Sequence, residues 1–423
     1  MFNEDFLHYI WKFKRFNTQE LTTTDGEAIQ ILKTGIHNQD AGPDFFNAQL
    51  KIGNTLWAGN VEIHIKSSDW DAHQHQTDAA YNNVILHVVY EHNSEITTAK
   101  NQTIPTFELK EYLDENLLQN YHQLFYSKNK IPCGNQLYKI DKLVFENWLE
   151  RLLLERLERK TTLISERLAA NKNDWEETFY QTLFKYFSLH VNAIPFEQLA
   201  LQTPLKIMEK HPQLVSIEAL LFGQAGFLND EVKDEYFQRL VREYQFLKSK
   251  FRLASMEKVI WKFSKLRPSN FPTLRISQLA MLLKSHTRMF AEILVKTNAS
   301  DIRKLFESEV SEYWLTHYQF GVLTKKKPKK TGKTILDSLM INVVSPFLFV
   351  YGKTHQQERY VELALELLQT TAAENNHIIT SWKNLGIIPC NAGQTQALIE
   401  LKNNYCQAFQ CLNCPIGIKL LEE

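Results

Sequence analysis

The segment from Gly42 to His92 constrains the fold of this chain more than any other part of its sequence. Two stretches of alternating apolar and polar residues flank the turn-like triplet Ile52–Asn54. Such alternation is typical of β-strands, because successive side chains of a strand point to opposite faces. In the second stretch, Glu62, His64 and Lys66 therefore share one face, opposite three β-branched residues. The pattern predicts a hairpin that carries three ionisable side chains in a row.

The residues around this hairpin add further groups that bind metals or transfer protons. Asp44 stands at the head of the first predicted strand, and His87 lies inside the next apolar run, Asn83–His92. Four more such side chains follow the second strand directly: His73, His75, Asp78 and Tyr81. This concentration of carboxylates and imidazoles in one short segment indicates a metal site or an acid–base site.

Composition and charge argue against several classes of protein. The formal net charge is zero, so no field of the whole protein attracts nucleic acid or an anionic membrane. We interpret the one dense basic run, Lys325–Lys330, as a solvated loop. The N-terminal residues do not resemble a signal peptide, and no run approaches the roughly eighteen apolar residues of a spanning helix. We therefore expect a cytoplasmic protein without membrane contact.

The patterning of the chain predicts an α+β protein with two domains of different class. Residues 1–125 are expected to form a small mixed-sheet domain. It would contain a helix over residues 4–16, the hairpin, the buried strand and an edge strand near Thr103–Lys110. Residues 140–385 have helical periodicity and are expected to form a large all-helical domain, in which Ile341–Gly352 fits either a buried helix or a short extended piece. Residues 386–423 are expected to form a cysteine-cluster segment that packs on the helical domain.

A proline-rich bend in the helical half carries two arginines. Arg267 and Arg275 lie on either side of Pro272, which fits the first turn of a helix, where proline is favoured. The bend is either a well-capped turn or a site at which both guanidinium groups bind phosphates or the carboxylates of the first domain.

Carboxylates on adjacent strand ends are suited to a hard divalent cation, which polarises a phosphoryl oxygen and lowers the pKa of bound water. Asp44 and Glu62 supply the carboxylates, and a basic group two residues after Glu62 can stabilise the developing charge. This arrangement resembles the PD-(D/E)XK signature of metal-dependent phosphodiesterases, because Pro43-Asp44 is followed by a hairpin and then by Glu62-Ile63-His64.

This resemblance implies a nuclease-like first domain and a set of residue roles. Asp44 and Glu62 would bind Mg²⁺ or Mn²⁺, and Glu4 on the first helix corresponds to an auxiliary ligand of many members. The signature lysine, which assists the nucleophilic water, is replaced by His64, while Lys66 lies one pleat further along the same face. His64 either takes over the role of the lysine, or marks a changed chemistry or a decayed site.

Five segments along the chain carry a second resemblance: GPDFFNAQL, GNVEIHIKSSDW with HQH, NVILHVV, RPSNFPTLRISQLA and YCQAFQCLNCPIG. They resemble an uncharacterised bacterial family known only as a domain of unknown function. This resemblance covers most of the length and implies no activity.

Several candidate residues have a purely structural alternative. Asp44 follows Gly-Pro and is either a ligand or a turn aspartate. Asp78 and Tyr81 fall where the helix of the PD-(D/E)XK superfamily lines the site, and either line it here or belong to an ordinary turn.

The histidines of this segment suggest a different function. His73 and His75 either bind a metal or lie exposed in a polar loop, and His87 is either a core histidine or a neighbour of Glu62. Because histidine is enriched in this segment, a histidine-rich zinc or manganese hydrolase of a small molecule is an alternative to a nuclease.

The last part of the chain contains four of its five cysteines, Cys390, Cys406, Cys411 and Cys414. Their C-x15-C-x4-C-x2-C spacing predicts a metal site, because a C-x2-C hook directs two thiolates at one ion and two further cysteines complete the set. Four thiolates bind Zn²⁺ or an iron–sulfur cluster, and the spacing leaves both open. We interpret Cys133 as a separate loop thiol.

Three functions remain open from the sequence. The first is a metal-dependent phosphodiesterase acting on DNA or RNA. The second is a decayed nuclease scaffold that binds nucleic acid or protein, and the third is the histidine-centred hydrolase. The sequence lacks the G-x-S-x-G, G-x-x-x-x-G-K-[ST] and G-x-G-x-x-G motifs of serine hydrolases, P-loop proteins and dinucleotide-binding proteins.

Overall fold

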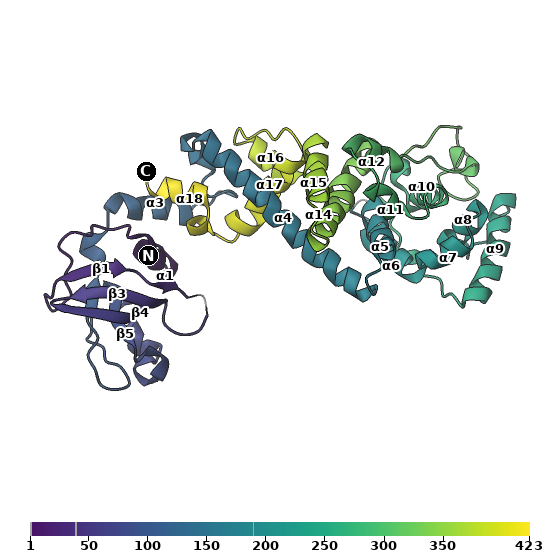
Figure 1. Cartoon of the computed structure of the whole chain (residues 1–423). Helices are drawn as coiled ribbons and strands as arrows, with labels where there is room; N and C mark the ends of the chain where they lie inside the picture. The colour runs from purple at the N-terminus through teal and green to yellow at the C-terminus, as the bar shows by residue number, and fades with distance from the viewer. Residues whose placement is uncertain (1, 39, 189) are drawn as a thin grey trace. The chain divides into compact units, whose positions relative to one another are not determined.

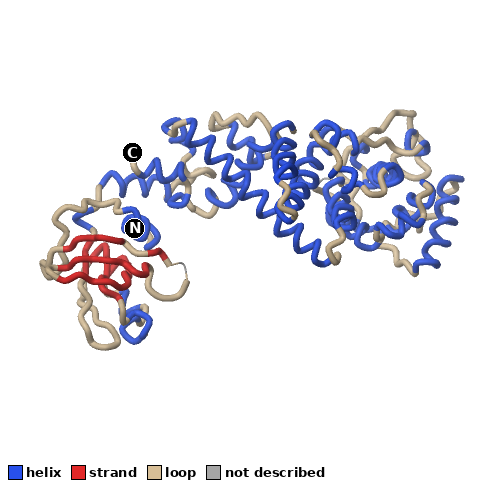
Figure 2. The backbone as a smooth tube through the Cα atoms, in the orientation of Figure 1, coloured by secondary structure: helices blue, strands red, loops and turns tan. Residues whose placement is uncertain are grey.

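The structure is a computed structural model that describes residues 2–38, 40–188 and 190–423. The chain divides into two compact units. Unit 1 comprises residues 1–148 and 402–423, and unit 2 comprises Leu149–Leu401. Figure 2 shows that the strands gather in unit 1, while the part of unit 2 that the structure describes is built from helices and loops. The predicted α+β class, with a mixed sheet in the N-terminal part and a large helical part after it, is confirmed.

The boundary near the C-terminus differs from the prediction. The sequence suggests that residues 386–423 form one segment on the helical domain, but Lys402–Glu423 belongs to unit 1. The helix α17 (Ala392–Glu400) passes into the π-helical turn η9 (Leu401–Cys406), where the chain changes unit. Beyond it, α18 (Pro415–Leu421) buries its apolar side chains against α3 (Glu115–Phe125) of unit 1.

Unit 1 contains a six-stranded sheet with the order β1-β3-β4-β5-β6, in which β2 also pairs with β3. The strands are β1 (Ile29–Lys33), β2 (Ile36–His37), β3 (Phe45–Ile52), β4 (Thr55–Lys66), β5 (Val84–Glu91) and β6 (Thr106–Glu108). β3 and β4 form the predicted antiparallel hairpin around Gly53-Asn54, and β4–β5 and β5–β6 are parallel pairs. Gly53 has a positive φ of 56°, which glycine adopts without the steric cost of a Cβ atom.

The two faces of the sheet are covered by different parts of unit 1. Phe45, Val61 and Val88 are fully buried on one face, and α1 (Glu4–Phe13) packs against β4 (Figure 1). The opposite face carries Glu62 and His64 of β4 and His87 of β5. This second face is covered by the short elements between β4 and β5, which are α2 (Asp69–Ala72), η1 (His75–Thr77) and η2 (Ala79–Tyr81).

The remaining helical segments of unit 1 follow the sheet and include the start of a long helix. They are η3 (Lys110–Tyr112), α3, η4 (Gly134–Lys139), η10 (Cys411–Asn413) and α18, and α4 (Lys142–Ala170) begins in unit 1 and continues into unit 2. Asp114 accepts a hydrogen bond from the backbone of Asn116 and so caps α3, as the preference of helix starts for aspartate predicts.

Unit 2 consists of helices, most of which contribute to one large apolar core. Its α-helices after α4 are α5 (Trp175–Phe187), α6 (Ala193–Gln202), α7 (Leu205–Lys210), α8 (Leu214–Gln224), α9 (Glu235–Phe251), α10 (Pro272–Ser285), α11 (Met289–Leu294), α12 (Ala299–Leu305), α13 (Lys333–Leu339), α14 (Ser345–Thr354), α15 (Glu358–Thr370), α16 (His377–Lys383) and α17. Its shorter turns are η5 (Lys258–Ile260), η6 (Pro268–Asn270), η7 (Glu312–Leu315) and η8 (Met340–Val344).

One helix of unit 2 is longer and more apolar than the sequence patterning suggests. Lys333–Thr354 runs through α13, η8 and α14 as 22 helical residues of mean hydropathy 1.6, which is long and apolar enough to cross a membrane. In the structure 78% of its apolar window is buried inside the protein, as in a core helix. Ile341–Gly352 is therefore helical. The π-helical turn η8 ends two residues before Pro346, whose ring removes one backbone donor from the helix.

The close approach of β4 to the start of β5 depends on Gly59. A Cβ atom at this position would lie 2.4 Å from Ile85 Cγ2 and 2.6 Å from the carbonyl oxygen of Asn83. We expect Gly59→Ala to destabilise unit 1 by about 1–3 kcal/mol, because the two strands must separate to admit the methyl group.

Hydrogen–deuterium exchange of peptides from β4 and β5 measures this opening separately from unit 2. Ala58→Val, at the neighbouring exposed position of the same strand, is the matched control and should leave protection unchanged. Equal protection in Gly59→Ala and the control would contradict the packing of β4 against the start of β5.

Candidate functional site

The candidate site lies on the sheet face that α2, η1 and η2 cover. Glu62 and His64 come from the second half of β4, and the parallel register places His87 of β5 directly beside Glu62. The sequence left open whether His87 is a core histidine or a neighbour of Glu62, and in the structure it is both. All three side chains are buried, with exposed fractions of 4%, 2% and 0%.

Asp44 and Glu62 are joined by two reciprocal hydrogen bonds. The backbone N–H of Asp44 donates to Glu62 Oε2 at 3.0 Å, and the backbone N–H of Ile63 donates to Asp44 Oδ2 at 2.9 Å. The regular ladder between β3 and β4 is interrupted here by a register shift between Phe45 and Ala48, so the two carboxylates tie the strands together instead. The structure therefore brings the two predicted ligands together, with Glu62 Oε1 outside these bonds.

Two side chains of α1 join this pair of carboxylates. His8 Nε2 lies 3.2 Å from Asp44 Oδ2. Burial by itself would lower the pKa of His8, but the contact with Asp44 and the charge of Asp44 raise it overall. Burial raises the pKa of Glu4, which also interacts with the charges of His73 and Asp44. Glu4 is thus close enough to interact with charges of the site, while its role as an auxiliary metal ligand stays a prediction. His8 was missed by the sequence reasoning, although it follows Glu4 by one helical turn and so shares its face.

A cluster of histidines surrounds the free oxygen of Glu62. Glu62 Oε1 lies 3.3 Å from His75 Nε2 and 3.6 Å from His64 Nε2. His64 Nε2 is also 3.1 Å from His73 Nδ1, and one ring nitrogen from each of the three histidines lies within 4.8 Å of the others. On its other side, His64 Nδ1 lies 2.8 Å from His87 Nε2.

The backbone and the aromatic shell direct these imidazoles toward one point. Gln74, between His73 and His75, has a φ of 64°, a left-handed conformation that is uncommon outside glycine. The Tyr81 ring stacks on His75 with centroids 3.8 Å apart, and the fully buried Trp70 contacts the rings of both His75 and His87. Trp70 is held by a hydrogen bond from its indole N–H to the carbonyl of Thr97.

Burial controls the protonation of the central side chains. Burial raises the pKa of Glu62 to about 7, and the charge of Asp44 adds to the rise while the hydrogen bond from His75 opposes it. Burial and the neighbouring histidines lower the pKa of His64 to about 3. His64 is therefore neutral near pH 7, and a neutral imidazole has the lone pair that binds a metal ion.

Three of these side chains are placed to share one metal ion. One ring nitrogen from each of His64, His73 and His75 lies within 4.8 Å of the others, a group that does not include Glu62. With metal–nitrogen bonds of about 2.0–2.1 Å, the ligand atoms of a tetrahedral site lie about 3.3 Å apart, and the 3.1 Å between His64 Nε2 and His73 Nδ1 is close to this value. The contact between His64 Nδ1 and His87 Nε2 resembles the outer hydrogen bond that fixes the tautomer of a ligating histidine.

Two of the predicted site residues have other roles in the structure. Lys66 is exposed at the end of β4, and among the described residues no ion pair joins its amine to Asp44 or Glu62. Its backbone N–H donates instead to Asp69 Oδ2. Asp78 accepts a hydrogen bond from the backbone of Ala80 and so caps η2 rather than entering the cluster.

The predicted phosphate-binding residues of unit 2 differ in exposure. Arg275 is buried, and its guanidinium donates to Gln278 at 2.7 Å and to Asn270 at 2.6 Å. This packing role replaces the phosphate role expected of it, while Arg267 is exposed.

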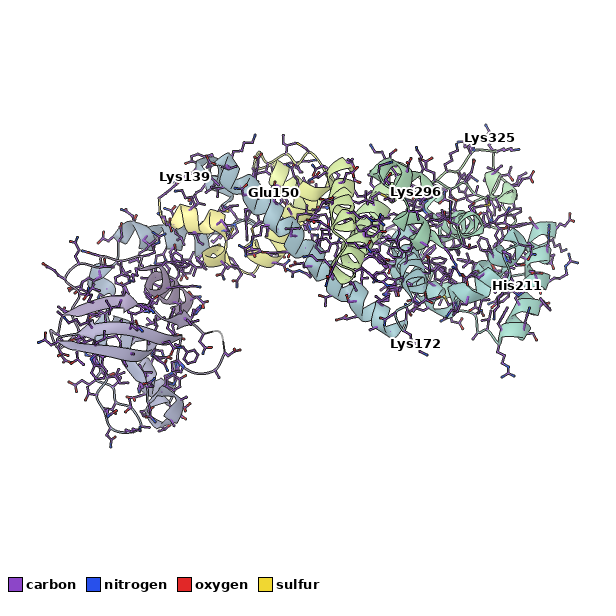
Figure 3. All side chains as sticks on the ribbon, viewed as in Figure 1. Lys139, Glu150, Lys172, His211, Lys296 and Lys325 are labelled. Carbon is purple, nitrogen blue, oxygen red and sulfur yellow. The ribbon has the colours of Figure 1, made fainter. Side chains whose placement is uncertain are left out.

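The basic run Lys325–Lys330 is mostly exposed, and Figure 3 shows the side chain of Lys325 projecting from its loop. Lys329 is the exception, because its buried amine donates to the carbonyls of Trp314 and His317. The run is therefore a loop with one internal anchor.

The predicted set of four tail cysteines is divided by the structure. Cys406, Cys411 and Cys414 are buried in unit 1, whereas Cys390 is exposed in unit 2, where its backbone N–H donates to Gln394. Cys133, interpreted from the sequence as a separate loop thiol, is a buried residue of unit 1.

A cleft of about 600 Å³ opens beside Asp44 and His8. Its walls come from α1, from the loop before β3 and from the C-terminal tail, and the residues are Asn3, Asp5, His8, Tyr9, Lys12, Phe13, His37, Asn38, Asp40, Asp44, Phe125, Ala408, Phe409, Gln410, Leu412 and Asn413. A second cleft of about 520 Å³ near Arg15 and Glu111 contains none of the clustered residues. The first cleft thus borders Asp44 and His8, and the clustered histidines are not among the residues that line it.

Comparison with known proteins identifies a family for the chain. The sequence profile of the family described as Protein of unknown function (DUF2851) matches residues 4–377, and the chain belongs to this family. The resemblance to a domain-of-unknown-function family is therefore confirmed. No curated protein and no solved structure matches the chain. The resemblance to PD-(D/E)XK enzymes stays a prediction.

The two neutral, buried histidines make the stability of unit 1 sensitive to acid. Burial lowers the pKa of both His64 and His87 below their unfolded value of about 6.5, so below that pH the unfolded state takes up protons that the folded state does not. In the metal-free protein, each should therefore remove about 1.4 kcal/mol of stability per pH unit below 6.5. Glu62, with its raised pKa, contributes in the opposite sense.

His87→Leu should halve the histidine part of this slope, because it removes one of the two groups and leaves Glu62 in place. Exchange protection of β4 and β5 between pH 7.5 and 5.5, corrected for the intrinsic rate, measures the slope. His377→Ala, at an exposed histidine of unit 2, should behave as wild type. A slope in His87→Leu equal to that of wild type would show that His87 is not held neutral.

Proposed function

We propose that this member of the DUF2851 family is a metal-dependent hydrolase of phosphodiesters, in which His64, His73 and His75 hold one Zn²⁺ or Mn²⁺ ion beside Glu62. The observation that carries the proposal is the convergence of one ring nitrogen from each of these histidines within 4.8 Å, with Glu62 Oε1 3.3 Å from His75 Nε2. Imidazole ligands favour Zn²⁺ over Mg²⁺. In this form Glu62 adjoins the ligands of the ion, and His64 becomes a ligand rather than a substitute for lysine.

The surrounding residues supply the other parts of a hydrolytic site. When bound, the ion would polarise a phosphoryl oxygen and lower the pKa of a water toward neutrality. His73 is the exposed ligand, so the cluster is open to solvent on its side. His8, whose pKa is raised by its contact with Asp44, stays protonated to higher pH than a free histidine and can give its Nε2 proton to a leaving oxygen.

The charge around the cleft bears on the substrate. Asp5, Asp40 and Asp44 line it, and Lys12 is its one lysine or arginine among the described residues. A polyanionic substrate such as DNA or RNA would meet repulsion there without a bound cation. We therefore place a short or single-stranded nucleic acid, or a small phosphodiester, at the site only together with its metal ion, in the cytoplasm.

A second candidate keeps the metal positions that the nuclease resemblance implies. In this form Mg²⁺ or Mn²⁺ binds Asp44, Glu62 and Glu4. The observation in its favour is the pair of hydrogen bonds that holds Asp44 and Glu62 together, with Glu4 close enough to interact with the charge of Asp44. The two candidates differ in the role of His73, which is a ligand only in the first.

Metal binding tests the histidine site directly. Because thiolates prefer softer metals, Mn²⁺ reports on nitrogen and oxygen ligands without interference from the cysteines. Titration of the chelator-treated full chain, followed by electron paramagnetic resonance, should show one tightly bound Mn²⁺. His73→Ala should weaken it at least tenfold, because an exposed ligand is lost without disturbing the core, and His377→Ala should not. No bound Mn²⁺ in the wild-type chain would contradict the site.

Hydrolysis tests the reaction and separates the two candidates. We expect cleavage of bis(p-nitrophenyl) phosphate and of single-stranded DNA or RNA with Zn²⁺ or Mn²⁺, and a loss of at least a hundredfold in Glu62→Gln and His73→Ala. Full activity of His73→Ala with Mg²⁺ would favour the carboxylate site. A wild-type chain that binds Mn²⁺ but cleaves no phosphodiester with any of these ions would favour the decayed scaffold.

A further inference from the structure

Four of the five cysteines meet in unit 1, although they come from distant parts of the sequence. Cys133 precedes η4, whereas Cys406, Cys411 and Cys414 belong to the C-terminal tail. All four are buried and unbridged, with exposed fractions between 7% and 9%. Buried free thiols occur singly in many proteins, whereas here four belong to the same unit.

Specific contacts bring the two segments together. The Lys402 amine, at the start of the tail, donates a hydrogen bond to the carbonyl oxygen of Lys130, three residues before Cys133. After Cys414, α18 packs against η4, which begins directly after Cys133. Both the start of the tail at Lys402 and its last helix, α18, therefore lie beside the Cys133 loop.

In keeping with these contacts, the thiols are close enough to affect one another's pKa. Burial raises the pKa of Cys133 to about 12, and Cys414 and Cys411 contribute to the rise. Burial also raises the pKa of Cys406, and Cys133, Cys414 and Cys411 add to this rise. Cys390 contributes to neither, and it belongs to unit 2.

The surroundings of Cys414 are suited to a thiolate. Burial raises the pKa of Cys414, while the backbone N–H groups of Gly417 and Ile416 and the side chain of Trp148 oppose the rise. Hydrogen-bond donors directed at a sulfur stabilise its anionic form and are characteristic of metal-bound thiolates. Gly417 permits this geometry, because a Cβ atom there would lie 2.2 Å from the carbonyl oxygen of Cys411.

We propose that Cys133, Cys406, Cys411 and Cys414 bind a thiophilic metal centre, either Zn²⁺ or an iron–sulfur cluster, and that Cys390 takes no part. Binding releases one proton from each thiol, and the positive charge of the metal offsets the burial of four thiolates. Cys133 replaces Cys390 in the set predicted from the tail spacing. The proposal is independent of the histidine site and of its function.

The spacing of the sulfurs bears on the metal. A single Zn²⁺ ion with Zn–S bonds of about 2.3 Å needs sulfurs about 3.8 Å apart. Among the described residues, no three of these sulfurs all lie within 4.8 Å of one another. A single Zn²⁺ ion would therefore have to draw the sulfurs closer together, whereas the sulfurs of an iron–sulfur cluster bind different iron atoms.

The proposed centre would also shape the cleft beside Asp44 and His8. The tail between Cys406 and Cys414 contributes Ala408, Phe409 and Gln410 to the wall of the cleft beside Asp44. A centre that fixes both ends of this stretch would hold the wall in place.

The test uses the full chain, purified without oxygen from cells supplied with iron and zinc, in a His73→Ala background that removes the proposed histidine site. We expect stoichiometric iron with acid-labile sulfide and visible absorption, or stoichiometric zinc without them. Cys133→Ser should lower the metal content at least fivefold, and Cys390→Ser should leave it unchanged. The reverse result would overturn the assignment.

Two measurements on the unsubstituted cysteines cover the case in which Cys133→Ser does not fold. X-ray absorption at the metal edge should show sulfur ligands only. A thiol reagent should modify one cysteine, Cys390, in the metal-bound chain and five after chelation. A folded chain that contains neither iron nor zinc would overturn the proposal. X-ray absorption that shows an oxygen or nitrogen ligand in place of the fourth sulfur would overturn it as well. Mn²⁺ binding at the histidine site is measured separately and does not depend on these outcomes.

Discussion

The two reciprocal hydrogen bonds between Asp44 and Glu62 are the contact on which the site depends. They occur where the β3–β4 ladder is shifted, near Asn47, whose left-handed φ of 58° accommodates the bulge. With Glu62 Oε2 and Asp44 Oδ2 engaged across the hairpin, Glu62 Oε1 is directed at His64 and His75. Without this contact, the carboxylate of Glu62 would have no fixed orientation relative to the histidines.

The parallel pairing of β4 and β5 adds the second constraint. A parallel pair needs a crossover, and here the crossover supplies Trp70, His73, His75 and Tyr81. The same segment that connects the strands therefore covers the polar face of the sheet and completes the cluster. Burying so many polar side chains is unfavourable unless they are neutral, hydrogen-bonded or bound to an ion. Burial accordingly lowers the pKa of His64 and raises the pKa of Glu62, which favours the neutral form of each side chain.

The tail links the proposed metal chemistry of the cysteines to the cleft. Residues 402–423 return to unit 1 and lie beside the Cys133 loop, so the wall of the cleft near Asp44 is built from both ends of the sequence. A local spacing rule could not reveal this, because Cys390 is much closer than Cys133 to the tail cysteines along the chain. The distinction between them arises at η9, where the chain leaves unit 2.

Local patterns in the sequence determined the secondary structure around the site. Alternation predicted the β3–β4 hairpin, and the parity of Glu62 and His64 placed both on one face. Parity also placed Lys66 there, yet it is exposed, because alternation says nothing about where the covering segment ends. Helical periodicity predicted α1 without showing that His8 would reach Asp44.

The sequence by itself determined the fold class, the hairpin and the family, because these follow from local periodicity and from motifs that are contiguous in the chain. Only the tertiary structure decided which side chains converge. The register of β5 set His87 beside Glu62, the bend at Gln74 brought His73 and His75 to His64, and the returning tail placed Cys406, Cys411 and Cys414 in the same unit as Cys133. Such convergence depends on long-range packing, which no local pattern records.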